Sequence, residues 1–439
     1  MKNLNFMRSH QWRSFHPAFR LLCLDAAFAM AYDSWMGPVY LSGLAGELGV
    51  SVKFVSFLTG LPWIGLVGQL LGLYFISKFY SPKRYTLIVT TLGRGLWLVP
   101  FLSALYYTLH SSKAGVPFPK ERWIMITAVC ACLISVFSSM GAAAWMSWVK
   151  GLVPLRFRGR FFGIRHRFVM IGIVIANLVA AIWISWKVEE YLLGYVMIGL
   201  LALLAGLISL LLLWQTPDVV SIEGVARPGS FSWSDIKKPF AHRDFKVLLF
   251  FWPIVHGAVQ IASPYFPFHF TKELGFSMST VAFWTMLANL GGVFAAIFWA
   301  SKMDQTKGTL KVILISGLAI SLSPVLYLFA SKPYLVWLAP IEHFINGGAW
   351  AAMVMSTMSL MLKAVPDEQS GVYFSVYFAF FGLCGASGVF LGGEIAGFIK
   401  HFGYGLKPLW AVGCFSRLIV FSFLYMMLIK KIIVKNFSA

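Results

Sequence analysis

The chain has 439 residues, of which 59% are apolar and only 12% are charged. Soluble domains carry roughly a quarter charged residues, so this composition excludes a typical soluble protein and favours a surface that faces lipid. The net charge of +20 does not indicate nucleic-acid binding, because the basic residues lie in short segments between apolar runs. We therefore expect an all-α polytopic membrane protein that lies in the lipid bilayer and has no nucleic-acid partner.

Twelve apolar runs approach or exceed the roughly 20 residues that a helix needs to cross a bilayer. They cover residues 17–41, 55–77, 86–108, 122–148, 168–187, 191–214, 246–270, 277–300, 311–330, 334–361, 371–396 and 407–429. These runs divide the chain into five parts: a basic N-terminal segment (1–16), an N-terminal six-helix bundle (17–214), a central loop (215–245), a C-terminal six-helix bundle (246–429) and a basic tail (430–439).

The two bundles share sequence features. The segment GELGVS at 46–51 reappears as KELGFS at 272–277, and VPLRFRG at 153–159 matches VPDEQSG at 365–371. Both matches lie at the ends of apolar runs, where chance similarity between hydrophobic helices is less of a concern. We therefore expect two pseudo-symmetric halves of six helices each.

Basic residues predict the orientation of the spans, because cytoplasmic segments of membrane proteins are enriched in Lys and Arg. If the N-terminus lies inside, most of the 36 Lys and Arg residues fall in cytoplasmic segments. The densest of these, residues 150–167, contains no acidic residue. We therefore expect both termini and the central loop to be cytoplasmic.

Enzymatic chemistry has no recognisable motif here. The sequence lacks a Gly-x4-Gly-Lys-Ser/Thr phosphate-binding loop, a Gly-x-Ser-x-Gly elbow and a His-Glu-x-x-His zinc site. The five cysteines lie inside apolar runs at spacings unlike those of metal sites. We expect a protein that is not an enzyme and that binds no cofactor or metal.

A motif after the second span suggests a family. Gly72 is followed by Ser77 and Lys78, and the segment ends with Lys83 and Arg84. This spacing resembles the loop between the second and third helices of the major facilitator superfamily, which usually reads Gly-x4-Asp-Arg-x-Gly-Arg-Arg. Here Ser77 replaces the Asp and Lys78 replaces the Arg.

The eleventh span adds a second resemblance. Gly388, Gly392 and Gly393 are spaced as in the Gly-Pro-x-x-Gly-Gly end of that family's antiporter motif, with Val389 in place of proline. With its twelve spans and two halves, the chain resembles the superfamily over essentially its whole length. The resemblance implies a secondary transporter of a bacterial inner membrane, of unspecified subfamily, whose halves alternate in exposing a central site.

The resemblance also implies that the first, fourth, seventh and tenth helices line a central cavity. Ionisable residues inside spans are costly and often functional, so Asp33 in the first span and His256 in the seventh are candidates for proton coupling. Structural alternatives stay open: Asp33 as the cap of a helix break, and His256 as a hydrogen-bonding partner between helices. The other cavity candidates are Tyr32, Tyr265, Glu342 and His343.

Two ion pairs are suggested by depth along the helices. At about 1.5 Å per residue, Asp25 and Arg94 lie at similar depths in the first half, as do Glu342 and Arg417 in the second. Buried opposite charges usually pair, so we expect structural ion pairs, with a role in coupling as the alternative.

Basic residues near the ends of the second and fourth spans are candidates for a gating loop. In the family they hold the cytoplasmic ends of neighbouring helices, and the matching residues are Lys78, Arg158, Gly159 and Arg160, the last three in a turn after Pro154. The alternative is that they only set topology and contact anionic lipid.

The sequence thus favours a proton-coupled secondary transporter that moves a small organic or amphipathic solute by alternating access. Two alternatives stay open: a flippase for a lipid or lipid precursor, and a non-transporting membrane assembly factor that keeps the fold. The oligomeric state is not specified by the sequence, and a monomer is compatible with it.

Overall fold

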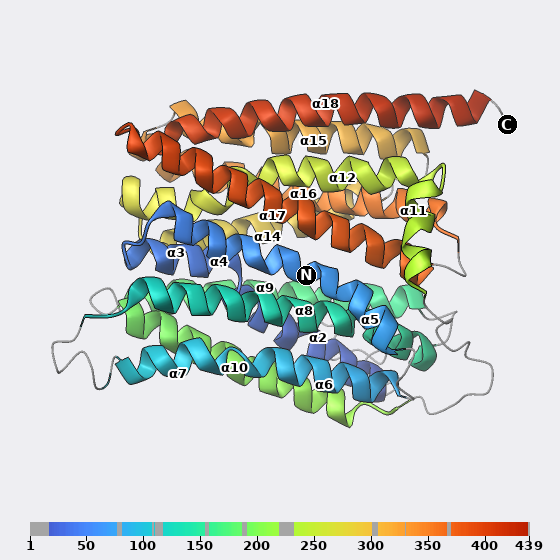
Figure 1. Cartoon of the computed structure of the whole chain (residues 1–439), viewed down its shortest axis with the longest axis horizontal. Helices are drawn as coiled ribbons and strands as arrows, with labels where there is room; N and C mark the ends of the chain where they lie inside the picture. The colour runs from blue at the N-terminus through green and yellow to red at the C-terminus, as the bar shows by residue number, and fades with distance from the viewer. Residues whose placement is uncertain are drawn as a thin grey trace.

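The computed structural model describes residues 17–76, 81–107, 109, 117–153, 158–186, 191–218, 232–300, 306–329, 331–366 and 370–437. Every regular element within these ranges is helical. The bilayer core offers no water to the backbone N–H and C=O groups, so these groups must pair with each other. A helix pairs them within a single segment. Figure 1 shows the long helices lying side by side along one direction.

The N-terminal half contains six spans, three of them interrupted. They are α2 (Pro17–Trp35) with α3 (Pro38–Glu47); α4 (Val52–Ile64), η2 (Gly65–Val67) and α5 (Gly68–Ile76); α6 (Pro82–Gly95) with α7 (Leu98–Tyr106); α8 (Lys120–Leu152); α9 (Arg158–Trp186); and α10 (Tyr191–Gln215).

The C-terminal half follows two short elements, η5 (Trp233–Ile236) and α11 (Lys237–Ala241). Its first span consists of α12 (Phe245–Gln260), η6 (Ser263–Tyr265), α13 (Phe266–Phe268) and the π-helical turn η7 (His269–Glu273). The others are α14 (Met278–Ala300), α15 (Thr306–Phe329), α16 (Lys332–Ala364), α17 (Ser370–His401) and α18 (Lys407–Phe437).

The twelve-helix prediction is confirmed. Eleven of the described spans are long and apolar enough to cross a membrane on their own. The first span is the exception, because α2 carries Arg20, Asp25 and Asp33 and is separated from α3 at Gly37 and Pro38. Proline suits the first position of α3, where a backbone N–H would have no helical partner.

Three segments differ from the sequence expectation. Helix α9 begins at Arg158 rather than near residue 168, and α18 continues to Phe437, through most of the expected tail. Helices can extend beyond the bilayer, and hydropathy detects only the part within lipid. The expected central loop contains α11, which crosses the ends of the long helices (Figure 1). The N-terminal segment 1–16 lies outside the described residues.

The internal repeat has a structural counterpart. Gly49 and Gly275, the glycines of the repeated segment, have φ angles of 64° and 65°, a conformation that favours glycine. In each half a lysine at the start of the fourth span donates to that glycine's carbonyl: Lys120 to Gly49 at 3.4 Å, and Lys332 to Gly275 at 2.9 Å. We call this side of the molecule the Gly49 end. The opposite side, where α2 begins and α18 ends, is the termini end.

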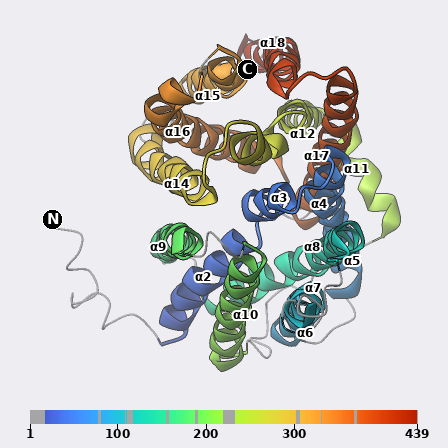
Figure 2. The ribbon, with the colours of Figure 1, turned by 90° about the vertical axis from the view of Figure 1, so that its left-hand side faces the viewer.

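The halves pack against each other along two lateral contacts and at the Gly49 end. Helices α4 and α5 pack on α17, and α9 packs on α14. At the Gly49 end α3 also packs on η6, α13 and η7. In the view from this end, α3 lies between the two groups of helices (Figure 2). The pairs α2 with α12 and α8 with α16 do not pack closely within the described chain.

Candidate functional site

Asp25 and Arg94 lie in the interior of the N-terminal half but do not form the expected ion pair in the described structure. Asp25 is buried and accepts a hydrogen bond from the Ser209 hydroxyl of α10. The Arg94 guanidinium donates to the Gly206 carbonyl at 2.6 Å and lies over the Tyr32 ring, 5.1 Å from its centroid. Both groups therefore find partners on neighbouring side chains and backbone, which corrects the pairing inferred from depth.

Asp33 differs from Asp25, because its side chain is exposed. Its carboxylate forms no hydrogen bond or ion pair with any residue that the structure describes, although it interacts electrostatically with Arg94. Tyr32, by contrast, is buried beneath the Arg94 guanidinium. Of these two cavity candidates, the structure leaves only Asp33 accessible.

Glu342 and His343 of α16 form a cluster with Tyr327 of α15. The Tyr327 hydroxyl donates to Glu342 Oε2, and His343 Nδ1 lies 3.0 Å from the same oxygen. His343 Nδ1 is also 2.9 Å from the Ala339 carbonyl and 3.2 Å from the Tyr327 hydroxyl. The Glu342 and His343 side chains are 14% and 19% exposed, and Glu342 Oε1 is buried without a hydrogen-bond partner among the described residues.

Arg417 of α18 does not pair with Glu342 in the described structure. Its guanidinium donates to the Val259 carbonyl at 2.9 Å and to the Ile320 carbonyl at 3.2 Å. The hydroxyls of Ser263 and Ser323 accept two further bonds, at 3.1 and 3.3 Å. Arg417 therefore ties α18 to α12 and α15, and the expected ion pair is corrected: main-chain and hydroxyl oxygens take its hydrogen bonds.

His256 is only 2% exposed, which corrects the expectation that it lines a cavity. The imidazole stacks on Phe381 and lies close to Trp63. Its Nε2 is 3.1 Å from the Gln260 amide nitrogen. The sequence placed His256 at mid-depth of the span but could not show that it points toward α4 and α17.

Tyr265 is also fully buried, with 0% exposure. Its hydroxyl donates to the Val389 carbonyl of α17 at 2.8 Å and shares a 2.8 Å hydrogen bond with Ser56 of α4. It therefore connects the two halves near the Gly49 end rather than facing an open cavity.

The gating-loop candidates are placed only in part. Lys78 lies outside the described residues, as does Pro154. Arg158, Gly159 and Arg160 form the first residues of α9 instead of the expected turn, and their side chains are not described. No proline interrupts residues 158–186, so the helix can begin at Arg158 and continue through the basic residues Arg165 and Arg167 into the apolar part of the span.

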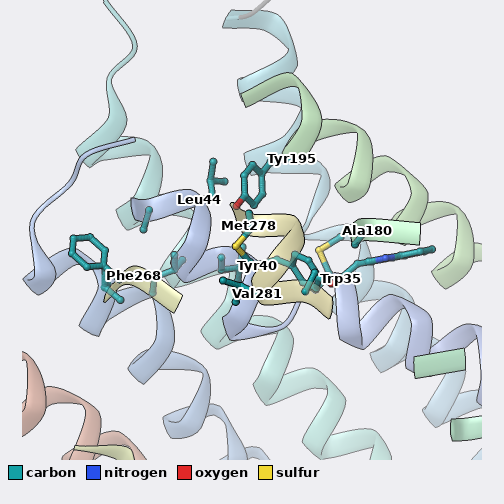
Figure 3. Close-up of a cluster of buried hydrophobic side chains, with 14 of the residues drawn as sticks. Trp35, Tyr40, Leu44, Ala180, Tyr195, Phe268, Met278 and Val281 are labelled. Carbon is teal, nitrogen blue, oxygen red and sulfur yellow. The ribbon is translucent and has the colours of Figure 1, made fainter. Parts of the chain in front are cut away.

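A buried apolar cluster closes the Gly49 end between the halves (Figure 3). Met278 lies beside Tyr195 and Tyr40, and the Tyr40 hydroxyl donates to Asn177 at 2.9 Å. The other labelled members are Trp35, Leu44, Ala180, Phe268 and Val281. At the termini end, the buried apolar clusters of the two halves are separate.

A polar cluster around Glu273, which no sequence motif predicted, lies at this closed end within the C-terminal half. Glu273 accepts hydrogen bonds from His269 Nδ1 at 2.7 Å and from the Leu406 backbone N–H at 2.9 Å, and lies 3.6 Å from Lys400. This polar cluster joins η7 to the end of α17 and to the connection between α17 and α18. Its one sequence signal was the repeated Glu-Leu-Gly segment that contains Glu273.

The family model of the Major Facilitator Superfamily matches residues 24–389. The chain belongs to this superfamily. Membership indicates a membrane transporter rather than an enzyme, and it agrees with the twelve spans in two halves. Among curated protein sequences, none matches this chain.

Several solved structures share the fold. The nucleoside transporter NupG has a TM-score of 0.69 at 15% identity, covering 95% of this chain and 100% of that one. A bacterial homologue of the iron transporter ferroportin in its inward-facing state has a TM-score of 0.67 at 12% identity, with 94% and 98% coverage. A D-xylose–proton symporter has a TM-score of 0.63 at 14% identity, with 92% and 96% coverage. At sequence identities this low, the structural likeness establishes the fold and not the transported solute.

Proposed function

We propose that this superfamily member is a proton-coupled secondary transporter that moves an organic solute by alternating access across a bacterial inner membrane. The observation that carries the proposal is the cluster of Glu342, His343 and Tyr327. A carboxylate and an imidazole in contact, partly exposed inside a span, form a site that can load and release a proton.

The hydrogen bonds assign the protons within this cluster. His343 Nδ1 faces three oxygen atoms, those of Ala339, Glu342 and Tyr327, so it carries a hydrogen and donates. The second nitrogen, Nε2, then holds the lone pair that accepts an incoming proton. The resulting imidazolium is stabilised by the neighbouring Glu342 carboxylate. Asp33, accessible in the other half, is the second candidate for proton exchange.

The arrangement of the halves supports alternating access. The Gly49 end is closed by α3 against α13 and η7, while α2 and α12 do not pack closely toward the termini end in the described chain. The likeness to the ferroportin homologue is higher for its inward-facing state, with a TM-score of 0.67, than for its outward-facing state, with 0.61. If the termini are cytoplasmic, as the basic residues predict, this conformation faces inward.

The first prediction tests the coupling site. Glu342→Gln removes the carboxylate that stabilises a protonated His343 and cannot itself bind a coupling proton. In proteoliposomes with an imposed pH gradient, we expect the variant to lose concentrative uptake of any solute that the parent accumulates from a panel including uridine and D-xylose. Exchange of that solute without a gradient should persist, because exchange requires the conformational change but no net proton movement.

Glu394→Gln is the matched control, because Glu394 is also a carboxylate within a span but is exposed on α17. It should behave like the parent protein. If Glu342→Gln still concentrates solute with an unchanged pH profile, Glu342 is not the coupling residue and Asp33→Asn is the next variant. If the parent protein moves no solute but translocates labelled lipid, the flippase alternative replaces the proposal. If the parent protein moves neither solute nor lipid, the assembly-factor alternative replaces the proposal.

A further inference from the structure

An aromatic cluster surrounds His256 at the interface of the halves. The imidazole stacks on Phe381 with centroids 4.0 Å apart and planes inclined by 18°. Its centroid is 4.7 Å from that of Trp63 and 5.9 Å from that of Trp350, both in edge-on contacts. Trp252 completes the cluster at 6.2 Å. Trp63 comes from α4 of the first half, and the other rings come from α12, α16 and α17 of the second.

The polar atoms of this cluster are hydrogen-bond donors. The Gln260 amide nitrogen donates to His256 Nε2, so the neutral imidazole carries its hydrogen on Nδ1. Nδ1 is buried and has no acceptor among the described residues. The structure also gives no acceptor for the indole N–H groups of Trp63, Trp252 and Trp350 within the part of the chain that it describes.

Three of the rings keep accessible surface: Trp63, Trp350 and Phe381 are half-buried, whereas His256 and Trp252 are buried. Flat apolar faces beside unpaired N–H donors are complementary to a planar ring that carries acceptor atoms. No carboxylate contacts these five side chains in the described structure, which disfavours an organic cation.

We propose that this cluster recognises a planar, acceptor-bearing solute, such as a heteroaromatic base, which stacks on Trp63 beside Trp350. Its acceptor atoms take hydrogen bonds from the indole N–H groups of Trp63 and Trp350, which keep accessible surface. This inference rests on the proposed transport function and deepens it by naming the class of substrate. Because the rings come from both halves, a bound solute contacts both parts that move during alternating access.

The test is equilibrium binding to the purified protein in lipid nanodiscs, with no proton gradient. Uridine and ribose are the probes, because they share the sugar and differ by the planar base. We expect uridine to bind and ribose not to bind at the same concentration. Trp63→Leu should weaken uridine binding at least about fivefold, the lower range for loss of one base–aromatic stack.

Trp63→Phe keeps a ring and should restore most of the affinity, which separates stacking from a folding defect. Trp337→Leu is the matched control, because Trp337 is 77% exposed on the surface of α16. Binding of ribose as tight as that of uridine, absence of uridine binding, or an unchanged Trp63→Leu variant would each overturn the inference. Proton-driven uptake of D-xylose by a protein that does not bind uridine would leave the transport proposal standing.

Discussion

A single hydroxyl group, that of Tyr265, joins three helices at the closed end. Tyr265→Phe keeps the ring but removes the bonds to Val389 and Ser56. We expect a loss of about 1–2 kcal/mol in the free energy of unfolding, because buried polar partners are left behind. The measurement is thermal unfolding of the detergent-solubilised protein.

Tyr334→Phe is the control for this variant, since Tyr334 is 66% exposed and its ring change should leave the melting temperature unaltered. Equal melting temperatures for Tyr265→Phe and the parent protein would show that the Tyr265 bonds contribute little to holding the halves together.

The polar residues show what sequence analysis can and cannot predict about the site. Depth along a helix follows from residue number, and Asp25, Arg94 and Arg417 are inside the spans as predicted. The hydrogen-bond partner of a side chain depends on which acceptors the neighbouring helices place within its reach. Arg94 therefore bonds to the Gly206 carbonyl, and Arg417 bonds to Val259 and Ile320. No sequence pattern specifies those main-chain acceptors.

At the scale of elements, glycines set the distance between α12 and α17. A Cβ atom on Gly388 would lie 2.0 Å from the Gly257 carbonyl oxygen, and one on Gly392 would lie 2.0 Å from that of Ile261. Small residues let transmembrane helices approach closely. The glycines that resemble an antiporter motif in the sequence therefore have a packing role in this structure.

Gly388→Ala should push α17 away from α12. Overpacking of this kind typically costs about 1–3 kcal/mol, so we expect a lower melting temperature. Gly397→Ala on the same helix is the control, because a Cβ there meets no atom within 4 Å. Equal stability of both variants would mean that α12 and α17 separate without cost.

The helix boundaries show a second limit of sequence analysis. The breaks near Pro38 and in the span containing Pro253 and Pro264 are visible from the prolines themselves. The start of α9 at Arg158 is not, because a helix that leaves the bilayer continues through polar residues without a hydropathy signal.

For the whole molecule, orientation is the prediction with the simplest test. Ser331 and Ser232 are exposed at opposite ends, near the starts of α16 and η5. In intact cells, Ser331→Cys should react with a membrane-impermeant maleimide, while Ser232→Cys should react only after permeabilisation. The parent protein, with its own five cysteines, measures the background.

Labelling of Ser232→Cys in intact cells would reverse the orientation and make the present conformation outward-facing.

The sequence predicted the twelve spans and the repeat, which depend on composition and periodicity. It could not predict which end is closed, because both conformations of a transporter bury the same spans against different partners.

The charged first span has a consequence for biogenesis. Helix α2 contains Arg20, Asp25 and Asp33, and charged residues near the centre of a helix oppose its partition into lipid. Its compensating contacts come from helices synthesised later: Trp35 donates to the Ala176 carbonyl of α9, and Asp25 accepts from Ser209 of α10. These partners lie 141 and 184 residues further along the chain, so we expect the first span to be poorly anchored in the membrane until α9 and α10 have been made.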